Sequence, residues 1–130
     1  DKTRALDELA RVLKPAGVLR IVNVDPTMMP RWWPYVFFPE TVDIDRKRFW
    51  SADRLCSKLE KQGFDVSLHR TFDRGSIALA QVLVEAERRD VSQLAVLDDA
   101  AYQRGLERLR AERRATVPNE FALYTLTARR

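Results

Sequence analysis

The sequence predicts an α/β fold, and three segments carry this prediction. Residues 5–24 combine an amphipathic helix, a Pro-Ala-Gly turn and a short aliphatic strand. Residues 51–69 repeat the order of helix, glycine and strand, and residues 121–128 form a last apolar strand. Helices that alternate with strands are typical of α/β domains. We therefore expect one α/β domain, although this alternation by itself assigns no function.

The first segment contains a helix that has to stop abruptly. Its leucines recur at three- and four-residue spacing over residues 5–14, which places them on one face of a helix. Pro15 cannot continue the helix, and Gly17 can adopt the backbone angles that a sharp reversal requires. The strand over 18–24 is rich in β-branched and aliphatic residues, which is typical of a strand buried on both faces.

The composition is that of an ordinary globular protein. Of 130 residues, 45% are hydrophobic and 32% are charged. No apolar run approaches the roughly 20 residues that a transmembrane helix needs. The charged N-terminus does not resemble a signal peptide, and Cys56, the only cysteine, excludes an intrachain disulfide. We expect no membrane partner and a reducing, cytoplasmic location.

Positive charge is concentrated near the C-terminus. Residues 101–130 hold seven Arg and three Glu, which accounts for the whole net charge of +4. Acidic and basic residues are equal in number over the rest of the chain. A basic face could attract nucleic acid. However, no aromatic residue is interleaved in the Arg-rich part of the helix in this region, as a groove that stacks single-stranded bases would require. We favour a solvated Arg-rich helix with intrahelical partners such as Glu107.

The segment over 25–50 is aromatic and interrupted by four prolines, at positions 26, 30, 34 and 39. The prolines break any long helix or strand, although short helical turns could lie between them. So many large aromatic side chains have to cover the core, a ligand or another chain. Ligands of open α/β sheets bind at the carboxyl ends of strands, and this segment follows such a strand.

The remaining elements follow from caps and periodicity. Ser51 is a good N-cap, and Gly63 ends the helix that follows it. Because the last strand is apolar on both sides, we expect it to be central, inserted between earlier strands. The expected elements are a helix over 52–62, a strand over 64–69, helices over 77–85 and from Asp98 or Asp99 to before Pro118, and a strand over 121–128.

Four stretches resemble motifs of one family, in the same order. Residues 5–22 are similar to "E-x-x-R-V-L-K-P-G-G-x-L-x-I", with Ala16 in place of the first glycine of the turn. Residues 38–64 are similar to "F-P-E-A…D…R-F-x-S-x-E-x-L…A-G-F", and residues 97–109 to "L-x-x-x-x-Y-x-x-G-L-x-R-L". Residues 121–130 resemble the closing strand. The family is the class I S-adenosylmethionine-dependent methyltransferases of the small-molecule type, close to methyltransferase type 11.

The resemblance implies the C-terminal half of a Rossmann-like methyltransferase sheet with about three strands. The strand over 18–24 would be parallel to that over 64–69, and the last strand would lie antiparallel between them. The chain would be a single domain over 1–130, with a helix-turn-strand over 1–24, an aromatic substrate-side loop over 25–50, and a helix-strand-helices-strand part over 51–130.

The cofactor-binding half of that family has no counterpart here. No glycine-rich G-x-G-x-G turn occurs, because the four glycines, at positions 17, 63, 75 and 105, are scattered. The resemblance implies S-adenosylmethionine for the parent enzyme, but no cofactor-binding residue carries over and no cofactor is expected on this chain. We therefore expect a C-terminal fragment that acts on a small-molecule methyl acceptor only together with the missing N-terminal half.

The resemblance also places candidate substrate-binding residues in the aromatic loop, where family members close over the methyl acceptor. An equally weighted alternative is that these side chains pack in the core or against a second chain. No catalytic residue is assigned, since His69 is expected to be a solvated strand-end residue and Cys56 a small core residue. No metal ligands have suitable spacing. The candidates are Arg31, Trp32, Trp33, Tyr35, Phe37 and Phe38.

Two other functions remain open. The strand over 18–24 would have an unpaired edge in this chain, so the chain could instead be a free-standing dimerisation or interaction module. The basic residues over 104–114 leave nucleic-acid binding as a third, less favoured interpretation. The expected partners are accordingly the missing half or a second copy in a homodimer.

Overall fold

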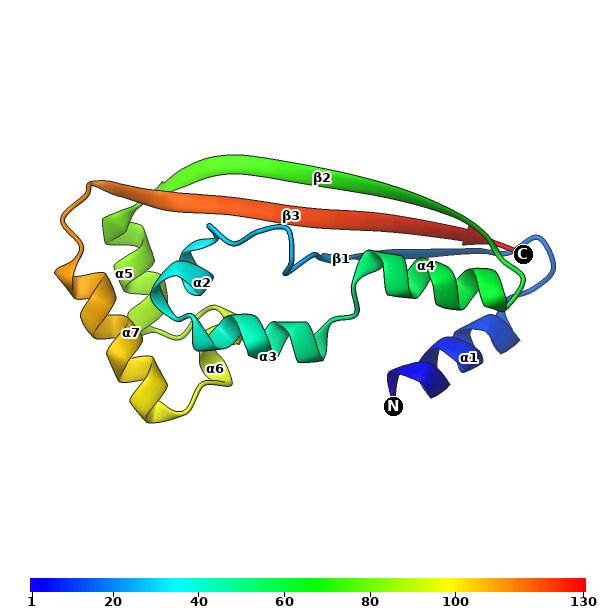
Figure 1. The fold of residues 1–130 in the computed structure, drawn as a ribbon, viewed down its shortest axis with the longest axis horizontal. Coiled ribbons are helices and arrows are strands. Elements are labelled where there is room, and N and C mark those ends of the chain that lie inside the picture. Colours follow the sequence, from blue (N-terminus) through cyan, green and yellow to red (C-terminus); the bar gives the residue numbers. More distant parts are fainter.

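Two long strands, β2 and β3, form an antiparallel ribbon that runs the length of an elongated molecule (Figure 1). The computed structural model describes residues 1–130. The strands are β1 (Val18–Val24), β2 (Asp65–Ala78) and β3 (Thr116–Arg129). The helices are α1 (Lys2–Val12), α2 (Trp33–Phe37), α3 (Glu40–Arg48), α4 (Ala52–Lys61), α5 (Leu79–Glu87), α6 (Ser92–Ala95) and α7 (Asp99–Ala111).

The strand order is β1-β3-β2, and both bonded pairs are antiparallel. The predicted fold class, a Rossmann-like sheet with two parallel strands, is wrong in that no two strands form a parallel pair: β1 and β2 run in the same direction, but each is bonded only to β3 and antiparallel to it. The physical reason is that β3 lies between β1 and β2, so these two strands share no hydrogen bonds. The central position expected for the last strand is confirmed.

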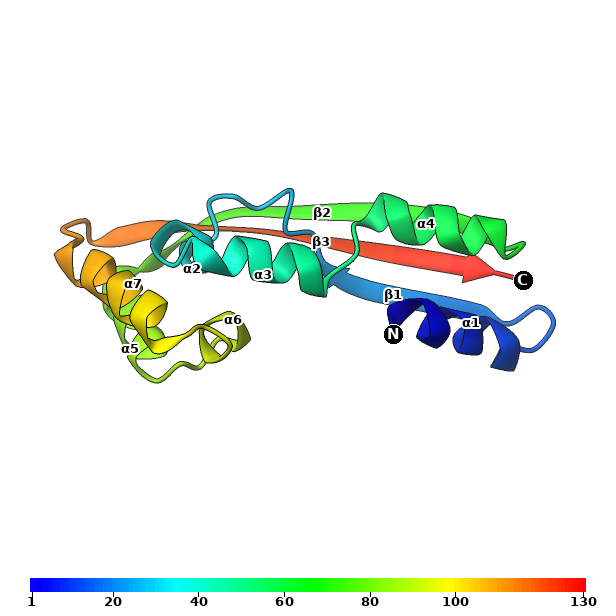
Figure 2. The same cartoon turned by 60° about the horizontal axis from the view of Figure 1, so that its bottom comes forward.

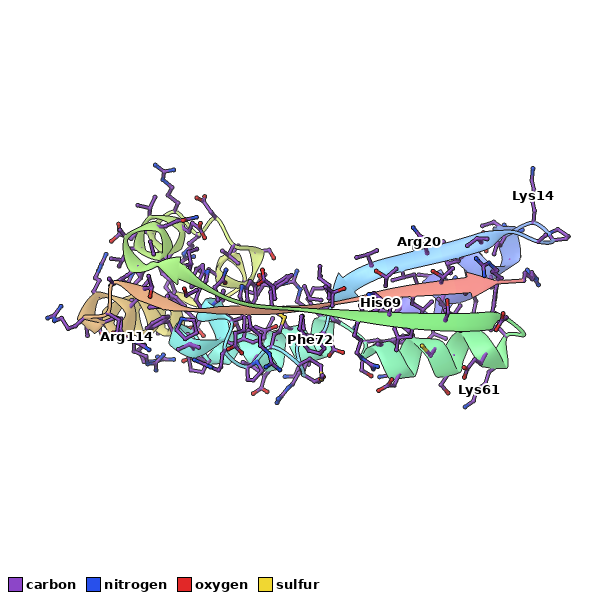
Figure 3. All side chains as sticks on the ribbon, turned by 90° about the horizontal axis from the view of Figure 1, so that it is seen from above. Lys14, Arg20, Lys61, His69, Phe72 and Arg114 are labelled. Carbon is purple, nitrogen blue, oxygen red and sulfur yellow. The ribbon has the colours of Figure 1, made fainter.

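Two packed regions lie at opposite ends of the ribbon. At one end, α1 and α4 cover one face of the sheet, with Leu59, Tyr124 and Leu126 fully buried (Figure 2). At the other end, α5, α6 and α7 enclose a second core together with residues of the α2 segment. Figure 3 shows Lys14 and Lys61 at the first end and Arg114 at the second, with His69 and Phe72 along β2 between them.

β1 is not buried on both faces, which corrects the expectation from its composition. Leu19 and Ile21 pack against the core under α1 and α4, whereas Val18 and Val22 on the opposite face are 51% and 58% exposed. β1 is also an edge strand, since only β3 bonds to it. An apolar strand with one open face and one unpaired edge is suited to contact further polypeptide.

Local signals in the sequence predicted the ends of the helices better than the lengths of the strands. The Ser51 side chain accepts from the amide of Arg54, and the Asp98 side chain accepts from that of Ala101, so both predicted N-caps are confirmed. The helix predicted over 77–85 begins later, because β2 continues through Ala78 before α5 starts. β3 likewise begins before its predicted start. It tolerates Pro118 because β1 pairs only with the later part of β3, which leaves one side of Pro118 free.

The turn before β1 differs from the sequence-based expectation. Ala16, rather than Gly17, has the positive φ of 63°. Gly17 is required for another reason, since a Cβ at this position would lie 2.7 Å from both Leu13 Cγ and the carbonyl oxygen of Lys14. None of the helices has the length and apolar character needed to cross a membrane.

Candidate functional site

A cavity of about 430 Å³ opens where β1 ends. Asp25, the residue after β1, is only 3% exposed, and its amide donates to the carbonyl of Ala122, which extends the ladder to β3. The hydroxyl of Thr27 donates to Oδ1 of Asp25 at 2.6 Å, and the amide of Thr27 donates to the same oxygen at 3.3 Å. These bonds hold Asp25 at the wall of the cavity in one orientation.

The junction between α3 and α4 forms the opposite wall. Arg46 and Lys47 belong to the last turn of α3, whereas Arg54 is in the first turn of α4. The guanidinium of Arg54 lies 4.4 Å from the centre of the Trp50 ring, a cation–π contact. The Trp50 carbonyl accepts from the hydroxyl of Tyr124 at 3.3 Å, which ties this junction to the central strand.

The predicted substrate-side residues do not form one surface. The side chains of Trp33, Tyr35, Phe37 and Phe38 are at most 5% exposed and pack inside the protein. This burial reflects the short helix α2, which turns their rings toward the cores. Whether any of the six contacts a substrate stays a prediction.

The two remaining candidates lie nearer the surface. Trp32 is half-buried and meets Tyr35 and Phe121 edge-on, with ring centres 5.1 and 5.5 Å away. Arg31 pairs with Glu120 at 3.0 Å and lines a second cavity of about 510 Å³, which Thr27 separates from the first. Of the six candidates, Arg31 alone lines a cavity.

A buried polar cluster beneath the aromatic segment was not predicted. Asp45 is fully buried, and its Oδ2 accepts from the Tyr35 hydroxyl at 2.8 Å and from the Gln93 amide at 2.9 Å. Arg48 lies 3.6 Å from Oδ1 of Asp45. Burial, reinforced by the bond to Asp45, raises the pKa of Tyr35 far above its usual value, so this phenol stays protonated. The cluster joins α2, α3 and α6, and no spacing in the sequence revealed it.

The histidine and the cysteine occupy unremarkable positions. His69 is exposed on β2, on the face of the sheet opposite α4, as expected for a solvated strand residue. Cys56 is half-buried in α4, and burial raises the pKa of its thiol, so the reactive thiolate is disfavoured. No three His, Cys, Asp or Glu side chains are grouped as metal ligands would be.

The arginines of α7 pair with acids on other elements. Arg104 and Arg108 approach Glu40 at 3.0 and 3.9 Å, and Arg110 approaches Glu87 at 2.9 Å. Glu107, the partner expected within the helix, forms no ion pair. Because two acids offset most of the charge of these three arginines, α7 offers little free positive charge for a nucleic-acid backbone.

None of the four glycines lies in a turn that leads from a strand into a helix. Gly17 and Gly63 precede strands, whereas Gly75 and Gly105 lie within β2 and α7. A strand-to-helix glycine turn is the feature by which nucleotide-type cofactors approach the backbone in open α/β sheets. The expectation that this chain holds no residue for S-adenosylmethionine stays a prediction.

The chain has a methyltransferase-like fold. A protein from Anabaena variabilis described as a methyltransferase of an antibiotic biosynthesis pathway superposes with a TM-score of 0.68 at 18% identity, over 96% of this chain and 60% of its own. One from Bacillus halodurans, also described as a methyltransferase, gives a TM-score of 0.56 at 16% identity, over 98% of this chain and 62% of its own. The chain thus spans about three fifths of the length of both structures.

Sequence comparisons give no match, either to a known protein-family model or to a curated protein. The likeness at these identities concerns the fold alone.

Proposed function

We propose that this chain forms the acceptor side of an S-adenosylmethionine-dependent methyltransferase that acts on a small molecule. The position of the first cavity carries this proposal. It opens at the carboxyl end of β1, where open sheets bind their ligands, within a methyltransferase-like fold. Its volume of about 430 Å³ suits a small molecule rather than a polymer.

The proposal assigns the cofactor to polypeptide beyond these residues. The absence of a strand-to-helix glycine turn supports this division, and so does the open face of β1, where Val18 and Val22 are exposed. A strand that paired with the free edge of β1 would complete its hydrogen bonds, and an element packed on the open face would bury both valines. About two fifths of each of the two similar structures lies outside the match, and such a strand could lie there. Alone, the chain would then transfer no methyl group.

Methyl transfer requires the acceptor side of the enzyme to do little more than hold the substrate in position. Methyl transfer needs the acceptor atom close to the methyl group and in line with the bond that breaks, and in some cases a base. A cavity with a fixed wall at Asp25 and Thr27 supplies position, because both residues are held by hydrogen bonds. We assign no catalytic base.

Titration of S-adenosylmethionine into the 130-residue chain, followed by calorimetry, tests this division of roles. The proposal predicts no measurable heat of binding. Micromolar binding would show that the chain itself holds the cofactor and would contradict the proposal.

A homodimer formed through β1 is the second candidate, and the same exposed strand favours it. Two copies could pair their β1 edges, and contacts between their open faces could cover Val18 and Val22, which are 51% and 58% exposed. Sedimentation equilibrium decides this point, with Val22→Lys as the diagnostic variant, because lysine on an edge strand opposes pairing. A dimer that Val22→Lys dissociates supports this candidate, whereas a monomer at high concentration excludes it.

A further inference from the structure

We propose that the first cavity binds an anionic oxygen group, a carboxylate or a phosphate, carried by a small molecule. Only the role of that molecule as the methyl acceptor rests on the proposed function. The binding itself follows from the charges that line the cavity.

Two cations at the cavity have no acidic partner. Neither Lys47 nor Arg54 forms an ion pair, although neighbouring arginines do. Lys47 meets Lys2 only through its backbone carbonyl, and the guanidinium of Arg54 rests on the Trp50 ring. Their charged groups remain free to bind a ligand from two different helices.

Three cations and one carboxylate, Asp25, line the cavity. Oδ1 of Asp25 accepts two bonds from Thr27, and Oδ2 lies 4.0 Å from Nε of Arg70, a cation outside the cavity lining. Arg46, the third cation of the lining, is 3.7 Å from the exposed Asp43. Arg70 also pairs more closely with Asp53, at 2.8 Å, so it offsets only part of the charge of Asp25. With Arg46 matched by Asp43, Lys47 and Arg54 are two cations against the one carboxylate of Asp25, which leaves the cavity positive.

The backbone also contributes positive potential at the cavity. The N-terminus of α4, a helix of ten residues capped by Ser51, lies at the cavity. Helix N-termini carry a partial positive charge and favour anions. The rings of Phe49 and Trp50 supply an apolar wall beside the cations. An anionic group attached to a flat ring or a short apolar body therefore matches both parts of the lining.

The test uses three probes of one shape: phenyl phosphate, benzoate and neutral benzamide. Each is titrated into the 130-residue chain at low salt, and binding is measured by calorimetry. We expect phenyl phosphate, benzoate or both to bind and benzamide not to bind, and the relative affinity of the two anions identifies phosphate or carboxylate as the preferred group. Lys47→Gln and Arg54→Gln should each weaken anion binding about tenfold, because each removes one charged contact.

Arg113→Gln is the matched control, since Arg113 is exposed at the end of α7, outside the cavity lining, and forms no ion pair. It should leave anion binding unchanged. Equal binding of benzamide, unchanged binding by both cavity variants, or no binding of either anion at about 10 mM would overturn the inference. These outcomes are independent of the cofactor titration, so failure of the anion site and failure of the proposed function can be told apart.

Discussion

The ring of Phe38 packs directly onto the backbone of α7 at Gly105. A Cβ at Gly105 would overlap the Cδ1 and Cε1 atoms of that ring. Tyr102, on the same helix, stacks against Phe38 with ring centres 6.1 Å apart and planes 19° apart. The contact joins two stretches that are 64 residues apart in sequence and that resemble separate motifs of the methyltransferases.

Gly105→Ala is therefore expected to lower the free energy of unfolding by about 2 kcal/mol, because an overpacked core has to move a ring or the helix. The sign of this change in stability is diagnostic, since replacing glycine by alanine at an unconstrained helix position stabilises a protein by roughly 0.5–1 kcal/mol. Urea denaturation measures the change. Gln103→Ala, at an exposed position of α7, is the control and should change stability by no more than about 0.5 kcal/mol. A stabilised Gly105→Ala variant would rule out the contact.

Ala16→Gly is expected to stabilise the protein by about 0.5–1 kcal/mol. Ala16 has a φ of 63°, which costs an L-residue energy that glycine avoids. Gly63→Ala is the converse test, because Gly63 has a φ of 85° with open space around its Cα, so only backbone strain would change. Thermal unfolding should move in opposite directions for the two variants. A shift of the same sign in both would contradict the backbone angles described above.

The buried Tyr35 predicts a loss of stability at alkaline pH. In the folded protein its pKa is raised by burial and by Asp45, whereas an unfolded tyrosine ionises near about pH 10. The folded state therefore keeps a proton that the unfolded state loses. The stabilisation is complete below about pH 10 and decreases as pH rises above it, by up to about 1.4 kcal/mol per pH unit.

Tyr35→Phe removes this dependence and isolates it from other groups. It should cost about 1 kcal/mol near neutral pH, since Asp45 keeps its bond from Gln93. Above about pH 10 the difference between the two proteins should shrink. Urea denaturation at several pH values measures both, and a difference that stays constant through pH 11 would contradict the protonated, hydrogen-bonded phenol.

Local signals in the sequence predicted much of the fold, and long-range pairing limited the rest. Ser51, Asp98 and Gly63 identified helix ends because caps and stops act over a few residues. The length of β2 could not be predicted, since residues 70–78 are exposed or half-buried and are held as a strand only by pairing with β3. The antiparallel pairing likewise depends on which distant strand occupies the central place.

The aromatic content of residues 25–50 could not show where its side chains lie, because aromatic residues are typical of both ligand surfaces and cores. Four of the six candidates are buried. The anion site that we propose depends instead on Lys47 and Arg54, which are ordinary helical cations in the sequence. A cation without an acidic partner is a property of three-dimensional placement, so no pattern in the chain could have revealed it.

The central claim is that this chain supplies the acceptor side and depends on other polypeptide for S-adenosylmethionine. The most direct measurement compares S-adenosylmethionine binding by the 130-residue chain with binding by the product of the complete reading frame that encodes it. The account predicts micromolar binding by the complete product and none by the 130-residue chain. Equal binding by both, or none by the complete product, would contradict it.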